Sequence, residues 1–163
     1  MAGPAVETLL YLMRRAFDGG EHSFVTNLQD VPDERWDAVA PGQAFGRSIG
    51  FIAWHTVAGK HLYWDPAFGA KTLTGDYTSE GVLSPRRSRD DVLAYGREWQ
   101  ANWLDSVEAL PDGALARPTT VHWGATLSMR RVIAAMIEHD LYHAGEINHL
   151  RAQLDGTDRA PGA

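Results

Sequence analysis

Residues 136–149 read MIEHDLYHAGEINH, and this stretch decides how the rest of the chain is interpreted. A helix advances about 100° per residue, so His139 and His143 lie about 40° apart and one turn above each other. Both imidazoles can therefore reach the same point. A divalent transition metal bound through imidazole usually takes three protein ligands when a coordination position stays open for chemistry. The stretch thus predicts two ligands of a metal site and requires a third from elsewhere.

A second helix, predicted over residues 49–64 and ending before Pro66, supplies that third ligand. Ser48 is a residue type that favours the N-cap of such a helix. One stripe of the helix is mostly apolar or small and consists of Ser48, Phe51, Ile52, His55, Gly59 and Leu62. His55 therefore points toward the expected core, and Gly59, one turn further on, leaves room beside the imidazole. We predict that His55 and the histidine pair of the first stretch bind one divalent metal.

Apolar residues recur at helical spacing in two further long segments and along the whole of the last one, and nothing strand-like of any length is present. Helices are expected over residues 4–18, 89–110 and 129–154, with shorter helical pieces over 21–30 and 33–36 and a short extended piece at 119–123. The stretches with loop composition are residues 31–47, 65–85 and 111–126. The pattern predicts an all-α fold in which the helices pack as a bundle.

The chain of 163 residues is long enough for one domain with a sizeable core and too short for two domains of ordinary size. We expect a single domain over residues 1–154. Residues 155–163 are rich in Gly, Pro and Asp and are expected to form a flexible tail.

Composition excludes several classes of function. The net charge is −6 and the only basic cluster is at residues 86–89, which argues against nucleic acid as the main partner. The chain has no cysteine, so disulfides and thiolate ligands are excluded and any thiol chemistry would use a thiol from outside. No basic segment typical of a secretory signal and no run near the ~18 apolar residues of a membrane span is present. We expect a cytoplasmic protein with no membrane partner.

The histidines allow two other interpretations. A lone histidine on an apolar helix face is more often a satisfied core residue than a ligand. Two neighbouring imidazoles without a shared partner would leave buried nitrogens unsatisfied, which favours a metal once His55 is added. The last stretch also resembles the zinc-protease pattern H-E-x-x-H-x-x-G-x-x-H, with Asp140 in place of the glutamate and Glu146 in place of the glycine. Without that glycine the helix continues and His149 lies about 80° from His139, so the protease interpretation is disfavoured.

Three motifs in this order and spacing carry a resemblance that covers nearly the whole chain. Residues 48–55 read SIGFIAWH, residues 137–147 read IEHDLYHAGEI, and His22-Ser23, Asn27-Leu28 and Trp36 precede both. Together they resemble the DinB-like metalloprotein superfamily, which is related to mycothiol-dependent maleylpyruvate isomerases and bacillithiol transferases. In that family the first two motifs correspond to the second and last helices, which carry the metal histidines.

The resemblance implies a four-helix bundle in up-down-down-up order, commonly a homodimer. It also implies one divalent metal, Zn or Ni most often and Fe or Mn in some members, held by His55, His139 and His143. Members of known activity transfer a low-molecular-weight thiol or isomerise its adducts, and some resemble amidases. A small-molecule substrate and an external thiol are therefore expected here.

Three further residues are candidates for the site. Glu146 and Tyr142 lie within about one turn of His143 and are candidate catalytic residues, as proton carriers or partners of the ligand histidine. The alternative for both is bundle packing or exposure to solvent. Arg151 is a candidate for binding an anionic cofactor, with a surface salt bridge as its alternative.

Two functional hypotheses follow from the sequence. The first is a metal-dependent enzyme, of the thiol S-transferase or hydrolase type, that activates water or a small thiol against a small electrophile. The second is a non-catalytic, stress-related or binding protein in which the metal only ties helices together.

Overall fold

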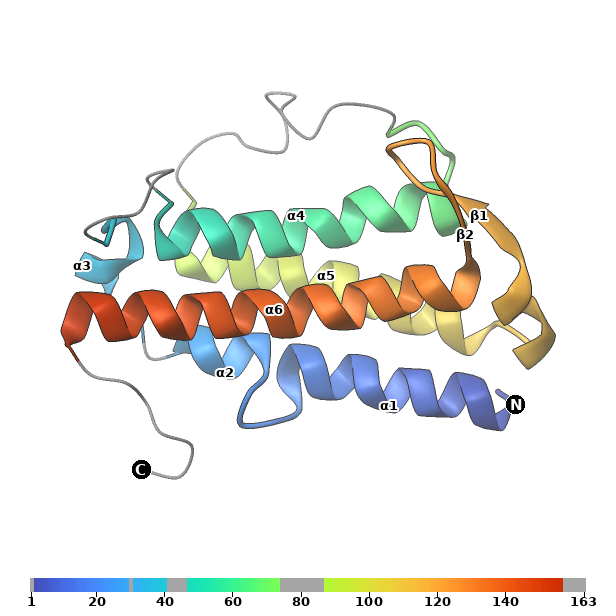
Figure 1. Ribbon diagram of the computed structural model, residues 1–163, viewed down its shortest axis with the longest axis horizontal. Helices are drawn as coiled ribbons and strands as arrows, with labels where there is room; N and C mark the ends of the chain where they lie inside the picture. Colours follow the sequence, from blue (N-terminus) through green and yellow to red (C-terminus); the bar gives the residue numbers. More distant parts are fainter. Residues whose placement is uncertain (1, 30, 41–46, 74–86, 157–163) are drawn as a thin grey trace.

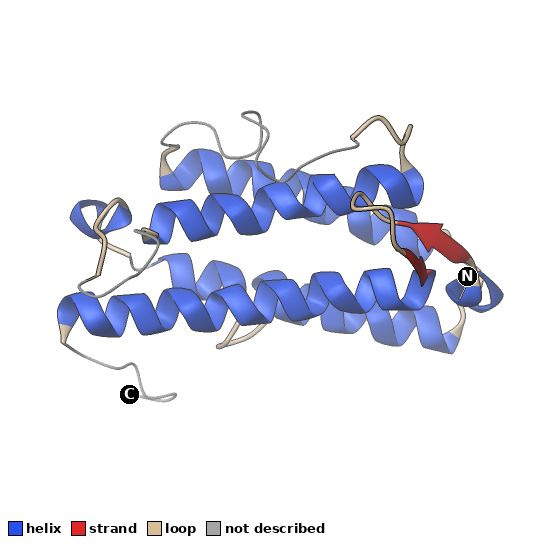
Figure 2. Cartoon of the chain, turned by 45° about the horizontal axis from the view of Figure 1, so that its top comes forward, coloured by secondary structure: helices blue, strands red, loops and turns tan. Residues whose placement is uncertain are grey.

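The structure is a computed structural model that describes residues 2–29, 31–40, 47–73 and 87–156. The described part of the chain is mostly helical, with one very small sheet (Figure 2). Its elements are α1 (Pro4–Asp18), α2 (Phe24–Gln29), α3 (Asp33–Trp36), α4 (Ile49–Phe68), α5 (Arg89–Glu108), the 3-10 helix η1 (Asp112–Ala116), β1 (Pro118–Thr120), β2 (Thr126–Ser128) and α6 (Met129–Asp155).

The four long helices form the bundle that the sequence predicted. Helices α1 and α6 run in one direction along the long axis, and α4 and α5 run in the other, which gives the up-down-down-up order (Figure 1). Helix α4 packs against α5 and α6, and α1 packs against the same two helices from the other side. The short α2 lies against α6. The all-α bundle is therefore confirmed.

The ends of the helices follow local side-chain chemistry. The Ser48 hydroxyl oxygen accepts the N–H of Phe51 at 3.1 Å, and this bond caps α4. The Ser88 hydroxyl oxygen does the same for Asp91 at the start of α5, also at 3.1 Å. Helix α6 is capped at its end by Gly156, whose φ of 67° lies in the left-handed region that glycine adopts without a steric penalty. The predicted cap at Ser48 is therefore confirmed.

The end of α4 differs from the prediction. The helix continues through Pro66 to Phe68, although proline lacks the N–H that would bond to the preceding turn. Other groups secure this end: the Gly69 N–H donates to the Asp65 carbonyl at 2.8 Å, and the Asp65 carboxylate accepts the N–H of Leu73, also at 2.8 Å. The prediction that this helix ends before Pro66 is therefore wrong, and the loop expected from residue 65 begins later.

Two smaller expectations also need correction. The extended piece predicted at residues 119–123 is the first strand of an antiparallel hairpin in which Pro118–Thr120 pairs with Thr126–Ser128. The second strand had not been expected. On α4, Phe51 was placed on the inner stripe but is 39% exposed, because only part of that stripe faces the bundle interior.

Some predicted segments fall partly beyond the described residues. Residues 41–46, 74–86 and 157–163 lie there, and they include much of the two longest predicted loops and most of the predicted tail. Residue 155, assigned to that tail, is the last residue of α6. Within the described residues, none of the helices combines the length and hydropathy needed to cross a bilayer.

The apolar core consists of two clusters separated by a polar layer. One cluster is built on α2, the first half of α4 and the end of α6, and the other on α1, the end of α5 and the start of α6. Along α6 the second cluster ends at Met136 and the first resumes at Ala144. The interval between them carries His139, Asp140 and His143, so the two hydrophobic clusters hold the polar residues of the bundle from both sides.

Candidate metal centre

The structure brings together three histidines from two helices. His55 on α4 and His139 and His143 on α6 each offer a nitrogen atom, and these three atoms lie within 4.8 Å of one another. The ring centroids are 5.3 Å apart for His55 and His139, 4.9 Å for His55 and His143, and 4.5 Å for the pair on α6. His143 is buried, and the other two imidazoles are partly exposed. This group could hold one metal ion with a side open to solvent.

The protonation states of the imidazoles suit a metal. Burial, together with the nearby His143 and Arg47, lowers the pKa of His55 to about 4. Burial, then the two other histidines and Lys60, lowers the pKa of His139 to about 2. Both imidazoles are therefore neutral at pH 7 and keep a lone pair, which a cation needs from its ligands.

A buried nitrogen atom without a hydrogen-bond partner also favours a bound metal. Nδ1 of His139 is buried and makes no hydrogen bond in the described part of the chain. A buried ring nitrogen without a partner is costly, and coordination of a cation at the cluster would allow one nitrogen of this imidazole to be satisfied. The residues present therefore fit a divalent metal.

Glu146 orients one of the three imidazoles. Its Oε2 lies 2.8 Å from Nδ1 of His143, one turn earlier on the same helix. With the proton on Nδ1, the imidazole donates to the carboxylate and leaves Nε2 free to act as a ligand. Burial lowers the pKa of His143, whereas the hydrogen bond to Glu146 raises it in part. A carboxylate behind a ligand histidine is a common arrangement in metal sites, and it raises the basicity of the ligand.

The other two candidate residues lie in different surroundings. Tyr142 is 70% exposed, and its ring meets the His143 ring edge-on with the centroids 5.0 Å apart. It therefore lies at the rim of the site. Arg151 is buried and donates from Nη1 to the Asn27 carbonyl at 3.3 Å, next to α2. Its burial excludes the surface position that the alternative interpretation of Arg151, a surface salt bridge, requires.

Sequence reasoning did not identify Arg47, which lies directly before the N-cap of α4. Its Nη1 is 4.0 Å from Oε1 of Glu146, and its guanidinium lies 5.9 Å from the centroid of the Phe51 ring. The positive charge contributes to the lowered pKa of His55 and of His143. Because Arg47 precedes the helix and has no periodic relation to His55, no sequence pattern marks it.

A second polar group lies in the same layer of the bundle. Nζ of Lys60 on α4 lies 2.6 Å from Oδ2 of Asp140 on α6 and donates to Oε1 of Gln100 on α5 at 2.9 Å. The amide of Gln100 donates in turn to the Met13 carbonyl of α1 at 3.2 Å. Burial lowers the pKa of Lys60 and raises that of Asp140, and the contact between them opposes both shifts. Asp140 is thus buried between α6 and α4, with Lys60 as its counterion.

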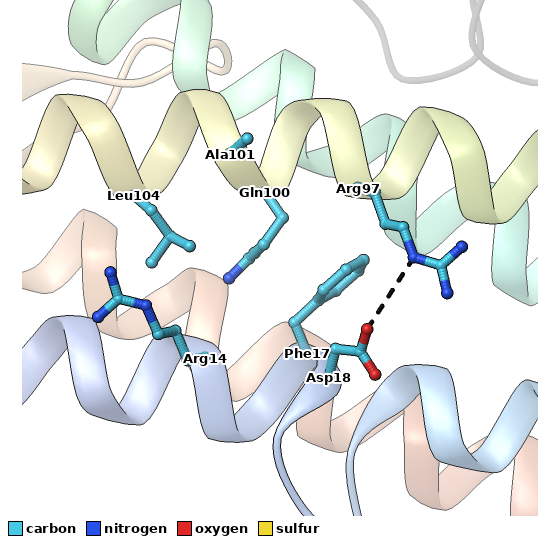
Figure 3. Close-up of a pocket in the computed structure, with 7 residues that line it drawn as sticks. All are labelled: Arg14, Phe17, Asp18, Arg97, Gln100, Ala101 and Leu104. Atoms are coloured by element: carbon cyan, nitrogen blue, oxygen red, sulfur yellow. Dashed lines mark ion pairs between the residues drawn. The ribbon is translucent and has the colours of Figure 1, made fainter.

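Gln100 also belongs to a cavity on another side of the bundle. The cavity has a volume of about 330 Å³ and lies between α1 and α5 (Figure 3). Phe17, Ala101 and Leu104 contribute its apolar lining. At its edge, Arg97 faces Asp18 with 4.0 Å between Nε and Oδ2. All of its lining residues come from helices that contribute no histidine to the cluster, so this cavity is distinct from the candidate metal centre.

The remaining histidines of the described chain do not join the cluster. Helix α6 continues unbroken past Glu146, and His149 is exposed on it. His61 has Nδ1 2.9 Å from the Tyr95 hydroxyl and stacks on Trp99 with the centroids 3.7 Å apart. The protease interpretation, which needs His149 as third ligand, therefore has no support in the geometry.

Comparison with known sequences agrees with this site. A family profile described as the DinB superfamily matches residues 16–147, which include all three histidines and most of the bundle. No curated protein matches the sequence. Because the profile covers well over half of the chain, this protein belongs to the DinB superfamily.

Proposed function

We propose that this member of the DinB superfamily is a metal-dependent enzyme that activates water or a small thiol for transfer to, or hydrolysis of, a small electrophile. The observation that carries the proposal is the meeting of three neutral imidazoles at a point with no fourth protein donor in their group among the described residues. A catalytic metal keeps an open position, whereas a structural metal is usually enclosed by four protein ligands. The partial exposure of His55 and His139 supports access for a small molecule.

The ligand set determines the chemistry. When bound, a divalent metal held by three neutral imidazoles keeps its double positive charge and lowers the pKa of a coordinated water or thiol toward neutrality. With the proton on Nδ1 of His143, Glu146 accepts that hydrogen bond and keeps the ring in one tautomer. The Glu146 side chain is 25% exposed, so it can also pass a proton to solvent. We propose Glu146 as a proton carrier and Tyr142 as a rim residue that contacts substrate.

The choice of metal and thiol is part of the proposal. Three imidazoles accept several ions, and we propose Zn or Ni, with Fe or Mn as the alternatives. Because the chain has no cysteine, the thiol is a separate small molecule. We propose a small-molecule substrate and a homodimeric enzyme, as is common in the family.

Metal analysis tests the site directly. Protein purified without an affinity tag is expected to carry about one divalent ion per chain, and His55→Ala, His139→Ala and His143→Ala are each expected to lose it, because two imidazoles bind a divalent ion much more weakly than three. His149→Ala is the matched control, since this exposed histidine lies on the same helix outside the cluster. Unchanged metal retention in all three variants of the cluster would contradict the proposal.

A second experiment separates the enzyme from a non-catalytic metal protein. Protein loaded with Co(II) is titrated with small thiols, and the visible absorption bands report whether the thiol enters the coordination sphere. A shift of the bands supports an open, catalytic site, and halogenated electrophiles and maleylpyruvate-like compounds are then screened with the thiols that bind. Bands that no thiol or anion changes would support the structural alternative.

A further inference from the structure

The cavity between α1 and α5 combines an apolar lining with charged groups at its two ends. Its apolar surface comes from Phe17, Ala101 and Leu104. Figure 3 shows Arg14 at one end of the cavity and the facing pair of Arg97 and Asp18 at the other. The volume of about 330 Å³ lies at the lower end of the range for ligand pockets, which is roughly 300–1,000 Å³. The cavity therefore has the size for a small molecule.

The guanidinium of Arg14 is the charged group of this cavity that the described residues leave unpaired. It takes part in no ion pair or hydrogen bond with them, whereas Nε of Arg97 lies 4.0 Å from Oδ2 of Asp18. Arg14 also borders a second, smaller cavity together with Glu7 and Glu108, but neither carboxylate forms an ion pair with it. Because the Arg14 side chain is exposed, its five N–H donors are available to a ligand.

A buried amide in the wall of the cavity offers a second donor. Gln100 is 6% exposed, and Figure 3 shows its side chain extending from α5 toward α1 between Leu104 and Phe17. Its Oε1 accepts from Lys60, which places Nε2 on the side of the cavity. Of the two N–H groups on Nε2, one donates to the Met13 carbonyl at 3.2 Å. The other N–H has no acceptor in the described chain, and an oxygen atom of a bound molecule would satisfy it.

The unfilled groups of the cavity favour an anion with oxygen acceptors. Both the Arg14 guanidinium and the remaining N–H of Gln100 donate hydrogen bonds, and a carboxylate supplies two oxygen atoms that can accept them. The lining residues carry two positive charges, on Arg14 and Arg97, and one negative charge, on Asp18. The whole chain has a net charge of −6, so its overall field repels anions. A preference for a carboxylate would therefore be a property of this cavity.

We propose that the cavity between α1 and α5 is a second ligand site, which binds a small monocarboxylate with an apolar or aromatic tail. The carboxylate accepts hydrogen bonds from Arg14 and from the amide of Gln100, and the tail packs against Leu104 and Phe17. The lining residues belong to helices that contribute no histidine to the metal centre. The inference therefore does not rest on the proposed function.

The test titrates the full chain with three probes by isothermal titration calorimetry. 3-Phenylpropionate and 3-phenylpropionamide share the aromatic tail and differ in charge, whereas acetate keeps the carboxylate without the tail. The wild type is expected to bind 3-phenylpropionate about fivefold more tightly than the amide, because hydrogen bonds to a charged group are stronger and the exposure of Arg14 limits the gain. Acetate is expected to bind about tenfold or more weakly than 3-phenylpropionate, because it buries little apolar surface.

Four variants assign the contacts. Arg14→Gln is expected to lose most of the preference for the charged probe, and Arg14→Lys to keep part of it, because lysine retains the charge but not the planar fork. Arg15→Gln is the matched control, since Arg15 is the next residue on α1, is also exposed, and donates to the Gly19 carbonyl instead of lining the cavity. Leu104→Ala is expected to weaken both phenyl probes by a similar factor and to leave their ratio unchanged.

Nuclear magnetic resonance locates the bound probe. In ¹⁵N-labelled protein, 3-phenylpropionate is expected to shift the side-chain NH₂ resonances of Gln100. The same titration of His143→Ala is expected to give unchanged constants, because the cavity and the metal centre share no residue. Binding lost in that variant would assign the probe to the metal centre and overturn the proposal. Unshifted Gln100 resonances, the same probe ratio in Arg14→Gln as in the wild type, or no binding of either phenyl probe would also overturn it.

Discussion

Two polar clusters connect α4 with α6, and they differ in whether their members satisfy one another. Lys60 and Asp140 carry opposite charges, are almost completely buried, and lie 2.6 Å apart. The three histidines also come from these two helices, but they are chemically alike, and two of them are only partly buried. The first cluster balances its charges among the described residues, although Oδ1 of Asp140 has no hydrogen-bond partner there. The second brings together three acceptors that could hold a cation from outside.

The difference separates a structural role from a functional one. Lys60 and Asp140, with Gln100 and the Met13 carbonyl, tie all four long helices together in the polar layer between the two hydrophobic clusters. Their position next to His139 fixes how α6 faces α4. The histidine cluster uses this geometry, and Nδ1 of His139 has no hydrogen-bond partner among the residues that the structure describes. A buried cluster whose opposite charges pair with each other therefore indicates architecture, whereas a cluster of chemically alike acceptors indicates a ligand.

The largest effect on stability is expected from removing one charge of the buried Lys60 and Asp140 pair. Lys60→Met leaves the Asp140 carboxylate buried without its counterion, and we expect the metal-free protein to lose about 3–5 kcal/mol of stability. Lys60→Met combined with Asp140→Leu is expected to recover only part of this loss, because Oε1 of Gln100 then has no donor. The stability losses of the single and the double variant are measured by urea unfolding monitored by circular dichroism.

The same variants test whether the two clusters have separate roles. The double variant is expected to keep three metal-binding histidines, so added Zn should still raise its unfolding midpoint. A double variant that is stable but no longer binds Zn would show that the ion pair belongs to the metal site and would remove the distinction between the clusters.

The sequence predicted the fold and the histidine cluster because both depend on helical periodicity. Spacing alone places His139 and His143 one turn apart, and the inner stripe of the second helix identifies His55. Glu146 follows from the same rule, three residues after His143. The other helix bounds agree with the prediction within about three residues, as at the piece predicted from residue 21, which begins at Phe24. At Pro66 the prediction fails, because hydrogen bonds from Gly69 and Leu73 secure a helix end beyond the proline.

The rest depends on how the helices are rotated and packed, which periodicity does not determine. Lys60 and Asp140 are charged residues that a sequence assigns to the surface, and only the crossing of α4 and α6 shows that they neutralise each other. Two arginines also show that sequence spacing does not determine which side chains lie at the site. Arg151 follows the motif by spacing but faces α2, whereas Arg47 has no relation in sequence to Glu146 and lies beside it.

A smaller effect, confined to the metal, is expected from Glu146→Gln. The amide can still accept a hydrogen bond from His143 but no longer stabilises positive charge on the imidazole, so metal affinity should fall about 10–100-fold. The stability of the metal-free protein should change little, because the carboxylate is partly exposed. Competition with a chromophoric chelator measures the affinity. Glu138→Gln on the same helix is the control, and an equal loss in that variant would mean that Glu146 acts only through net charge.

The smallest effect is expected in the pH dependence of the metal-free protein. The pKa values of His55 and His139 in the folded chain, about 4 and about 2, lie below the value of about 6.5 expected when the chain unfolds. Between these values the unfolded chain binds protons that the folded chain does not. The contribution is therefore fully present above pH 6.5 and is lost as the pH falls toward 4. Urea midpoints between pH 7.5 and 4.5 measure this loss in the wild type.

The variant His55→Asn/His139→Asn is expected to lose less stability over the same interval, because two of the groups that resist protonation are gone. Part of the pH dependence of stability should remain, since burial also lowers the pKa of His61, His122 and His143. Partial exposure of the cluster limits the effect, because a protonated imidazole can be rehydrated by a small local movement. Parallel curves for the two proteins would show that the histidine cluster is already satisfied within the chain. It would then resemble the Lys60 and Asp140 pair, and the argument that it requires a cation from outside would fail.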